Sequence, residues 1–334
     1  MDLVLRFGVS LLPVVLFLIT LVYLDSYKLV HPRPLVMAIL IGAVVALVCL
    51  SINDAVIHQL GIRRRMSSRY FAPVLEEVLK AGYVAWLIRR GRVGFPVDAA
   101  ILGFAVGCGF ALIENTYYLQ TLKTSGIAVW VVRGLGTAVM HGGMTAMFAI
   151  IAKSLYDRHE GKGAWWLPGL LLAIGLHSLF NHFILPPIVS TVVLHATLPG
   201  MILFVFWRSE RATKHWLGER MDVDAELLEI INSGQISESR IGHYVEAMKK
   251  QFSPEVLIDI LCYLRVHVEL AIAAKGVLMM REAGFKASAP AGTQEKFREL
   301  RHLEHSIGKT GRLAIAPFLH TSSRDLWQIY MLDQ

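Results

Sequence analysis

Charged residues are scarce in this chain, at 18% of 334 residues, against the roughly 25% that is usual for soluble proteins. Apolar residues reach 54%, which excludes a simple soluble domain. Long apolar runs dominate up to about residue 207, and the remainder is charged and mixed. We therefore expect a membrane domain over residues 1–207 and a soluble, mostly helical C-terminal domain over 208–334.

Other absences narrow the class of protein. Three widely separated cysteines, Cys49, Cys108 and Cys262, form no CxxC pair, which argues against a disulfide framework and a cysteine zinc site. No basic stripe with interleaved aromatics is present, so the net charge of +7 indicates contact with anionic lipid headgroups rather than nucleic acid. The N-terminus has no basic region or small-x-small cleavage site, so we expect a retained first helix.

Apolar runs long enough to cross a bilayer recur along the first 207 residues, since a span needs about 20 apolar residues. They predict an all-α fold, a polytopic membrane helix bundle of about seven transmembrane helices with a helical cytoplasmic C-terminal domain. The expected spans are 4–24, 35–53, 71–88, 97–120, 127–153, 165–186 and 189–207.

Basic residues follow the third, fifth and seventh expected spans, which places that side and the C-terminal domain in the cytoplasm of a cell (inner) membrane. One group, Arg63–Arg65 with Arg69, would lie outside and disagrees with this orientation. Either residues 52–68 form an interfacial amphipathic segment or one span is miscounted.

The expected spans also carry ionisable and polar side chains. A charge at the bilayer centre costs about 2.5–3.5 kcal/mol, so such groups face a bundle interior and find partners or water. They are Glu76, Glu77, Lys80, Glu114, Arg133, His141, His177, Asn181 and His182.

Helical spacing predicts how the glutamates are placed. Glu76 and Lys80, at i and i+4, share a face and are expected to pair, whereas Glu77 points about 100° away and either orients backbone or holds Arg133. Glu114 lies late in the fourth span and Glu76 early in the third. Because consecutive spans are antiparallel, the two carboxylates should meet near the outer side of the membrane.

The remaining polar groups lie beside these carboxylates in the expected bundle. Asn115 either hydrogen-bonds Glu114 or caps the helix end. His177 and Asn181 share a face, while His182 is rotated about 140° from His177 and should face elsewhere. Glycines beside His141 allow close helix approach.

Paired carboxylates with histidines and an amide suit hydrolysis of an amide bond by activated water, with His or Asn binding the oxyanion. Two glutamates and two histidines also suit a divalent metal such as zinc, although no HExxH motif is present. A proton-coupled transporter could use the same groups, but the chain shows no internal repeat of the kind transporters often have.

Four motifs in order resemble one family. Glu76-Glu-Val-Leu-Lys80 resembles EExxK, Phe110-Ala-Leu-Ile-Glu114 with Asn115 resembles FxxxE, and His141 and His177-xxx-Asn181 follow. Over about residues 65–185 the chain resembles the PrsW family of intramembrane proteases. That family is related to the type II CAAX prenyl endopeptidases and to bacteriocin-processing and immunity proteins.

The resemblance implies a bacterial membrane protease that cuts a membrane-anchored protein, as the family's best-known member cuts an anti-sigma factor. Glu76, helped by Glu114 or His141, would activate water, and His177 and Asn181 would stabilise the oxyanion. The alternative is a non-catalytic scaffold or immunity factor of the same fold. The implied catalytic set is Glu76, Glu77, Glu114, His141, His177 and Asn181, supported by Lys80, Asn115 and Arg133; a metal, if present, would be held by Glu76, Glu114, His141 and His177.

Overall fold

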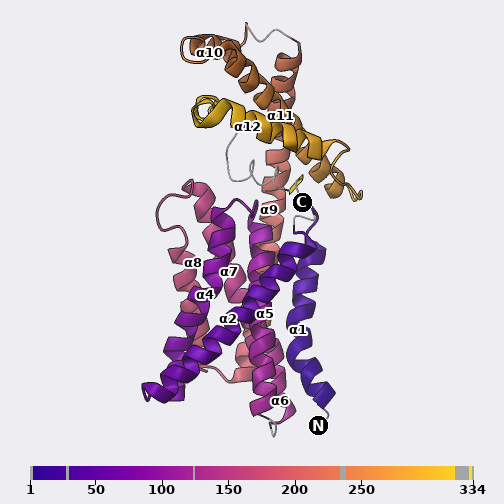
Figure 1. Ribbon diagram of the computed structural model, residues 1–334. Helices are drawn as coiled ribbons and strands as arrows, with labels where there is room; N and C mark the ends of the chain where they lie inside the picture. The colour runs from indigo at the N-terminus through magenta and orange to yellow at the C-terminus, as the bar shows by residue number, and fades with distance from the viewer. Residues whose placement is uncertain (1–2, 28–29, 123–124, 234–237, 320–330, 333–334) are drawn as a thin grey trace. The chain divides into compact units, whose positions relative to one another are not determined.

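The computed structural model describes residues 3–27, 30–122, 125–233, 238–319 and 331–332, and every regular element within these ranges is a helix (Figure 1). The chain divides into two compact units, Met1–Ser209 and Glu210–Gln334. The all-α prediction is therefore confirmed for the described residues.

The first unit is a bundle of long helices joined by short ones. Two of the short segments are π-helical, η1 (Ser67–Phe71) and η2 (Val132–Ala138). The α-helices are α1 (Leu3–Leu24), α2 (Pro32–Gln59), α3 (Arg64–Met66), α4 (Ala72–Arg89), α5 (Pro96–Thr121), α6 (Ile127–Val131), α7 (Val139–Arg158), α8 (Leu167–Asn181) and the start of α9 (Pro187–Asn232).

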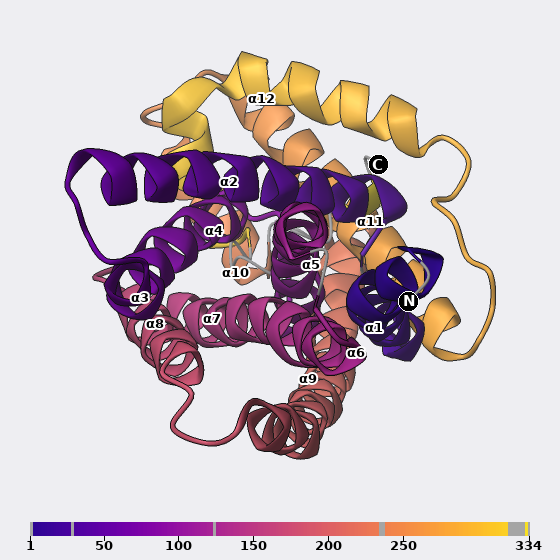
Figure 2. The same cartoon turned by 90° about the horizontal axis from the view of Figure 1, so that it is seen from below.

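Helix α5 lies at the centre of this bundle, between α2 and α7, with α1 also against it (Figure 2). Glycines bring the backbones into contact on both sides. A Cβ on Gly109 would lie 1.9 Å from the carbonyl oxygen of Ile39 on α2. A Cβ on Gly107 would lie 2.3 Å from that of His141 on α7. Small residues at such crossings let helices approach closely, and here they fix the height at which His141 enters the bundle.

Gly109→Ala should destabilise the first unit by about 1–3 kcal/mol, because the added methyl group meets backbone rather than a movable side chain. The matched control is Gly82→Ala on α4, where an added Cβ meets nothing within 4 Å and alanine favours the helix. Thermal unfolding of both variants in detergent measures the difference. Equal midpoints would show that the α2–α5 contact does not need glycine.

Five helices in the described residues are long and apolar enough to cross a membrane. The other two expected spans correspond to α4, which carries the charged residues, and α8, which is a shorter apolar helix of 15 residues. The number of crossings stays a prediction. The five are Val4–Leu24, Pro32–Gln59, Pro96–Thr121, Ile127–Arg158 and Pro187–Asn232.

Two boundaries differ from the expectation. Helix α2 continues to Gln59, so residues 52–68 are not one interfacial segment: they are the end of α2, a short connection, α3 and the start of η1. The fifth expected span, 127–153, is interrupted by the π-helical turn η2. A π-helix adds a residue to the turn, which apolar periodicity does not reveal.

The second unit contains the rest of α9 with α10 (Arg240–Met248), α11 (Pro254–Glu282) and α12 (Thr293–Ile315). Helix α11 begins as expected, with Ser253 at the N-cap and Pro254 in the first turn. Its buried Lys275 forms a short ion pair with Asp224 of α9. Pairing compensates the two buried charges, so this contact has a structural role within the unit.

Candidate active site

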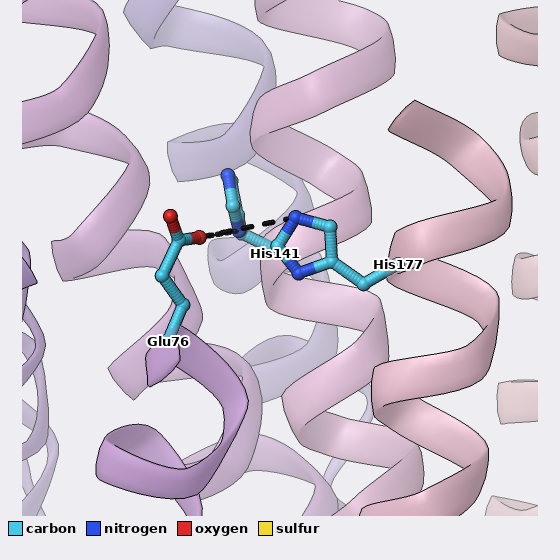
Figure 3. Close-up of side chains that lie close together, drawn as sticks. All are labelled: Glu76, His141 and His177. Carbon is cyan, nitrogen blue, oxygen red and sulfur yellow. Dashed lines mark ion pairs between the residues drawn. The ribbon is translucent and has the colours of Figure 1, made fainter. Parts of the chain in front are cut away.

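Three buried side chains from three helices meet inside the first unit: Glu76 of α4, His141 of α7 and His177 of α8 (Figure 3). Glu76 Oε2 lies 4.0 Å from His141 Nδ1 and 3.8 Å from His177 Nε2. One potential ligand atom from each residue lies within 4.8 Å of the other two. We call Glu76, His141 and His177 the Glu–His–His cluster.

His177 is oriented by the second glutamate of α4. Its Nδ1 lies 2.8 Å from Glu77 Oε1, and both side chains are buried. An ionised carboxylate only accepts hydrogen bonds, so Nδ1 carries the hydrogen and donates it to Glu77. The other ring nitrogen, Nε2, faces Glu76 and carries the lone pair in the neutral tautomer.

His141 is oriented in the opposite sense. Its Nε2 lies 3.2 Å from Glu114 Oε2 and donates a hydrogen bond to that carboxylate. Its Nδ1 lies 3.3 Å from Lys80 Nζ and accepts from that ammonium, which can only donate. Each histidine thus turns one ring nitrogen toward the cluster, Nδ1 in His141 and Nε2 in His177.

Glu114 is held in turn by a partly buried network. Arg133 Nη2 donates to Glu114 Oε2 at 2.9 Å, and Arg133 Nε donates to Asn115 Oδ1 at 2.9 Å. Asn115 Nδ2 donates to the Ser10 carbonyl of α1 at 2.8 Å. The network fixes the carboxylate that fixes His141, and it supports Glu114 through Arg133 rather than directly.

Three expected contacts are wrong. Lys80 pairs with Glu77, at 2.6 Å, and not with Glu76. Arg133 binds Glu114 and not Glu77. Asn115 does not cap a helix end, because α5 continues to Thr121. The physical reason for the first error is that i,i+3 and i,i+4 neighbours both share a helix face, and here His177 on α8 selects the position of Glu77.

The two residues of the last motif, His177 and Asn181, have different contacts. His177 joins the cluster, but Asn181 Nδ2 donates to the Ser68 carbonyl of η1 at 2.9 Å. His182 turns away as expected: its Nδ1 lies 2.7 Å from the Ser178 carbonyl, and its ring packs edge-on against Tyr70. The oxyanion role of Asn181 stays a prediction, and it requires the amide to leave Ser68.

Sequence reasoning gave no role to two groups that contact the site. The Phe110 ring lies 4.8 Å from the His141 ring and 4.8 Å from Lys80 Nζ, so it forms one wall of the cluster. Its place in the FxxxE motif was the available signal. The Ser10 carbonyl that holds Asn115 is a backbone group, and no sequence pattern marks it.

The first unit is thus a helical bundle with buried glutamate and histidine side chains at its centre, which suits an intramembrane hydrolase. Residues 31–208 match the sequence profile of the PrsW family intramembrane metalloproteases, and this chain belongs to that family. It is therefore a multi-pass membrane protein with a protease domain. No curated protein and no solved structure matches the chain.

The family description names a metal, and the residues present fit one. Glu76 Oε2 is buried and has no hydrogen-bond partner among the described residues. One carboxylate and two imidazoles are a zinc-type donor set, whose ligand atoms lie roughly 3.4 Å apart in a tetrahedral site, close to the 3.8 and 4.0 Å seen here. Glu77 and Glu114 accept the other ring N–H of each histidine, as metal-binding histidines require. Glu114, expected as a fourth ligand, instead holds His141.

Proposed function

We propose that this protein is an intramembrane endopeptidase that hydrolyses a peptide bond of a membrane-anchored protein, using water activated at the Glu–His–His cluster. The observation that carries the proposal is the meeting of Glu76, His141 and His177 inside an apolar bundle, each with one potential ligand atom close to those of the other two. The family match to intramembrane metalloproteases supports the same reaction class.

Glu76 Oε2, His141 Nδ1 and His177 Nε2 would hold a zinc-type ion, which when bound acidifies a water molecule and polarises the scissile carbonyl. The chain's own groups do the rest. The second carboxylate oxygen of Glu76 takes the proton of the attacking water and returns it to the leaving amine. Glu77 and Glu114 keep each imidazole in the tautomer that the cluster needs.

The remaining parts of the proposal concern place and substrate. The buried site selects a substrate that shares the bilayer, and an anti-sigma factor is one such protein that the resemblance implies. The protein would reside in the cell (inner) membrane with the unit Glu210–Gln334 in the cytoplasm, as the basic residues after the odd-numbered spans favour. That unit would be a separate, non-catalytic domain, since the cluster lies entirely within Met1–Ser209.

The test compares His177→Ala with His182→Ala, two histidines of one segment of which only His177 joins the cluster. New N-termini of membrane proteins are compared by mass spectrometry between cells expressing wild type and each variant. We expect at least one fragment that is present with wild type and His182→Ala and absent with His177→Ala.

Identical fragment profiles from all three strains, at equal protein levels, would contradict the proposal. A stable protein partner recovered with no fragment in any strain would favour the non-catalytic scaffold instead.

A further inference from the structure

Lys80 is a fully buried ammonium group placed directly beside the Glu–His–His cluster. Its Nζ lies 2.6 Å from Glu77 Oε1 and 3.3 Å from His141 Nδ1, with the Phe110 ring as its apolar wall. Nothing in the proposed reaction uses this cation. Yet it contacts the same nitrogen that His141 would offer to a metal ion.

We propose that Lys80 is a positioning residue that holds His141 Nδ1 by hydrogen bonding and must release it before a metal ion binds, so that it limits metal affinity. The inference rests on the proposed metal-binding role of the cluster. It concerns control of loading and assigns Lys80 no part in the chemical step.

Lys80 and a metal ion would compete for one nitrogen of the His141 ring. Nδ1 of neutral His141 has one lone pair, because Nε2 carries the hydrogen that is donated to Glu114. That lone pair can accept the Lys80 N–H or coordinate an ion, but it cannot do both. Binding of an ion therefore costs the Lys80–His141 hydrogen bond.

Glu77 is the partner that Lys80 keeps after release. Its contact with Glu77 is much shorter than that with His141, and the pair is one helical turn apart on α4. A lysine ammonium on its flexible stem can turn toward Glu77 alone without moving the backbone. Glu77 then keeps both of its donors, Lys80 and His177, so the buried carboxylate remains compensated.

The positive charge of Lys80 also lowers the affinity of the site for a metal ion. Three carboxylates of the site, Glu76, Glu77 and Glu114, face two fixed cations, Lys80 and Arg133. A divalent ion would leave an excess of positive charge in a buried place, where charges interact strongly. Removing Lys80 relieves this repulsion and also frees Nδ1.

The test measures metal affinity of the purified full chain in detergent, with Zn²⁺ and Co²⁺ as probes. Lys80→Met, of similar length but apolar, should bind both ions about 10-fold or more tightly than wild type in chelator competition. Its Co²⁺ absorption spectrum should keep the wild-type shape, since the three ligands are unchanged. Arg133→Gln is the matched control: it removes one cation of the same network without freeing Nδ1, so it should tighten binding less than Lys80→Met does.

Each result decides the matter. Equal or weaker affinity in a folded Lys80→Met protein would overturn the inference alone, while absence of metal binding by wild type would overturn the proposed cluster as well. If Lys80→Met does not fold, Lys80→Gln, which keeps a donor for Glu77, takes its place. Failure of both to fold would make Lys80 a structural requirement and would also overturn the inference.

Discussion

Glu76→Gln should lower the rate of substrate cleavage by about 1,000-fold and should sharply reduce the metal content of the purified protein. The substitution keeps the size of the side chain and removes its charge, so the cluster loses both an anionic ligand and its proton acceptor. General-base catalysis alone contributes about 100- to 10,000-fold. Cleavage of a substrate found by fragment analysis gives the rate, and elemental analysis gives the bound metal.

The matched control for this variant is Glu160→Gln, at an exposed glutamate after α7 that forms an ion pair with the exposed Lys162. It should leave both rate and metal content unchanged. Full activity of folded Glu76→Gln would refute the central role of Glu76. Loss of activity with normal metal content would assign Glu76 to proton transfer and exclude it as a ligand.

Stripping the metal with a strong chelator should abolish cleavage, and adding Zn²⁺ should restore it. The melting temperature should also fall by about 5 °C or more, because an ion present at 100 times its dissociation constant stabilises the folded state by about 2.7 kcal/mol. This experiment separates a metal-assisted reaction from one in which glutamate and histidine activate water unaided. Differential scanning fluorimetry and the cleavage assay supply the two measurements.

Glu76→Gln is also the control for the chelator itself. A variant that holds no ion should show no change of melting temperature on chelation, whereas nonspecific effects of the chelator would shift it as in wild type. Undiminished cleavage by a protein shown to be free of metal would favour the purely glutamate- and histidine-based mechanism.

Much of the fold could be predicted from the sequence because apolar run length and helix-breaking residues are local properties. The starts of α2, α4, α5 and α11 all coincide with prolines that the sequence displays. The π-helical segments could not be predicted in this way. Their form depends on neighbouring helices, such as the close approach of Gly134 in η2 to the Val9 carbonyl of α1.

The sequence predicts which residues belong to the site, but it does not predict which partner each of them contacts. Buried ionisable groups in apolar helices, such as Glu76 and His177, mark a site because their cost demands partners. Which partner each one takes depends on helix rotation and depth. Lys80 was assigned to Glu76 by spacing, yet it binds Glu77, because His177 from a helix about 100 residues later fixes that carboxylate.

The charges of α4 have a consequence for how the chain enters the membrane. This helix is not among the five that are apolar enough to cross alone, and its Glu77 and Lys80 have hydrogen-bond partners on α8 and α7, His177 and His141. Those helices are synthesised later. The charges of α4 are therefore compensated by groups that the ribosome adds later, and burial of this helix depends on them.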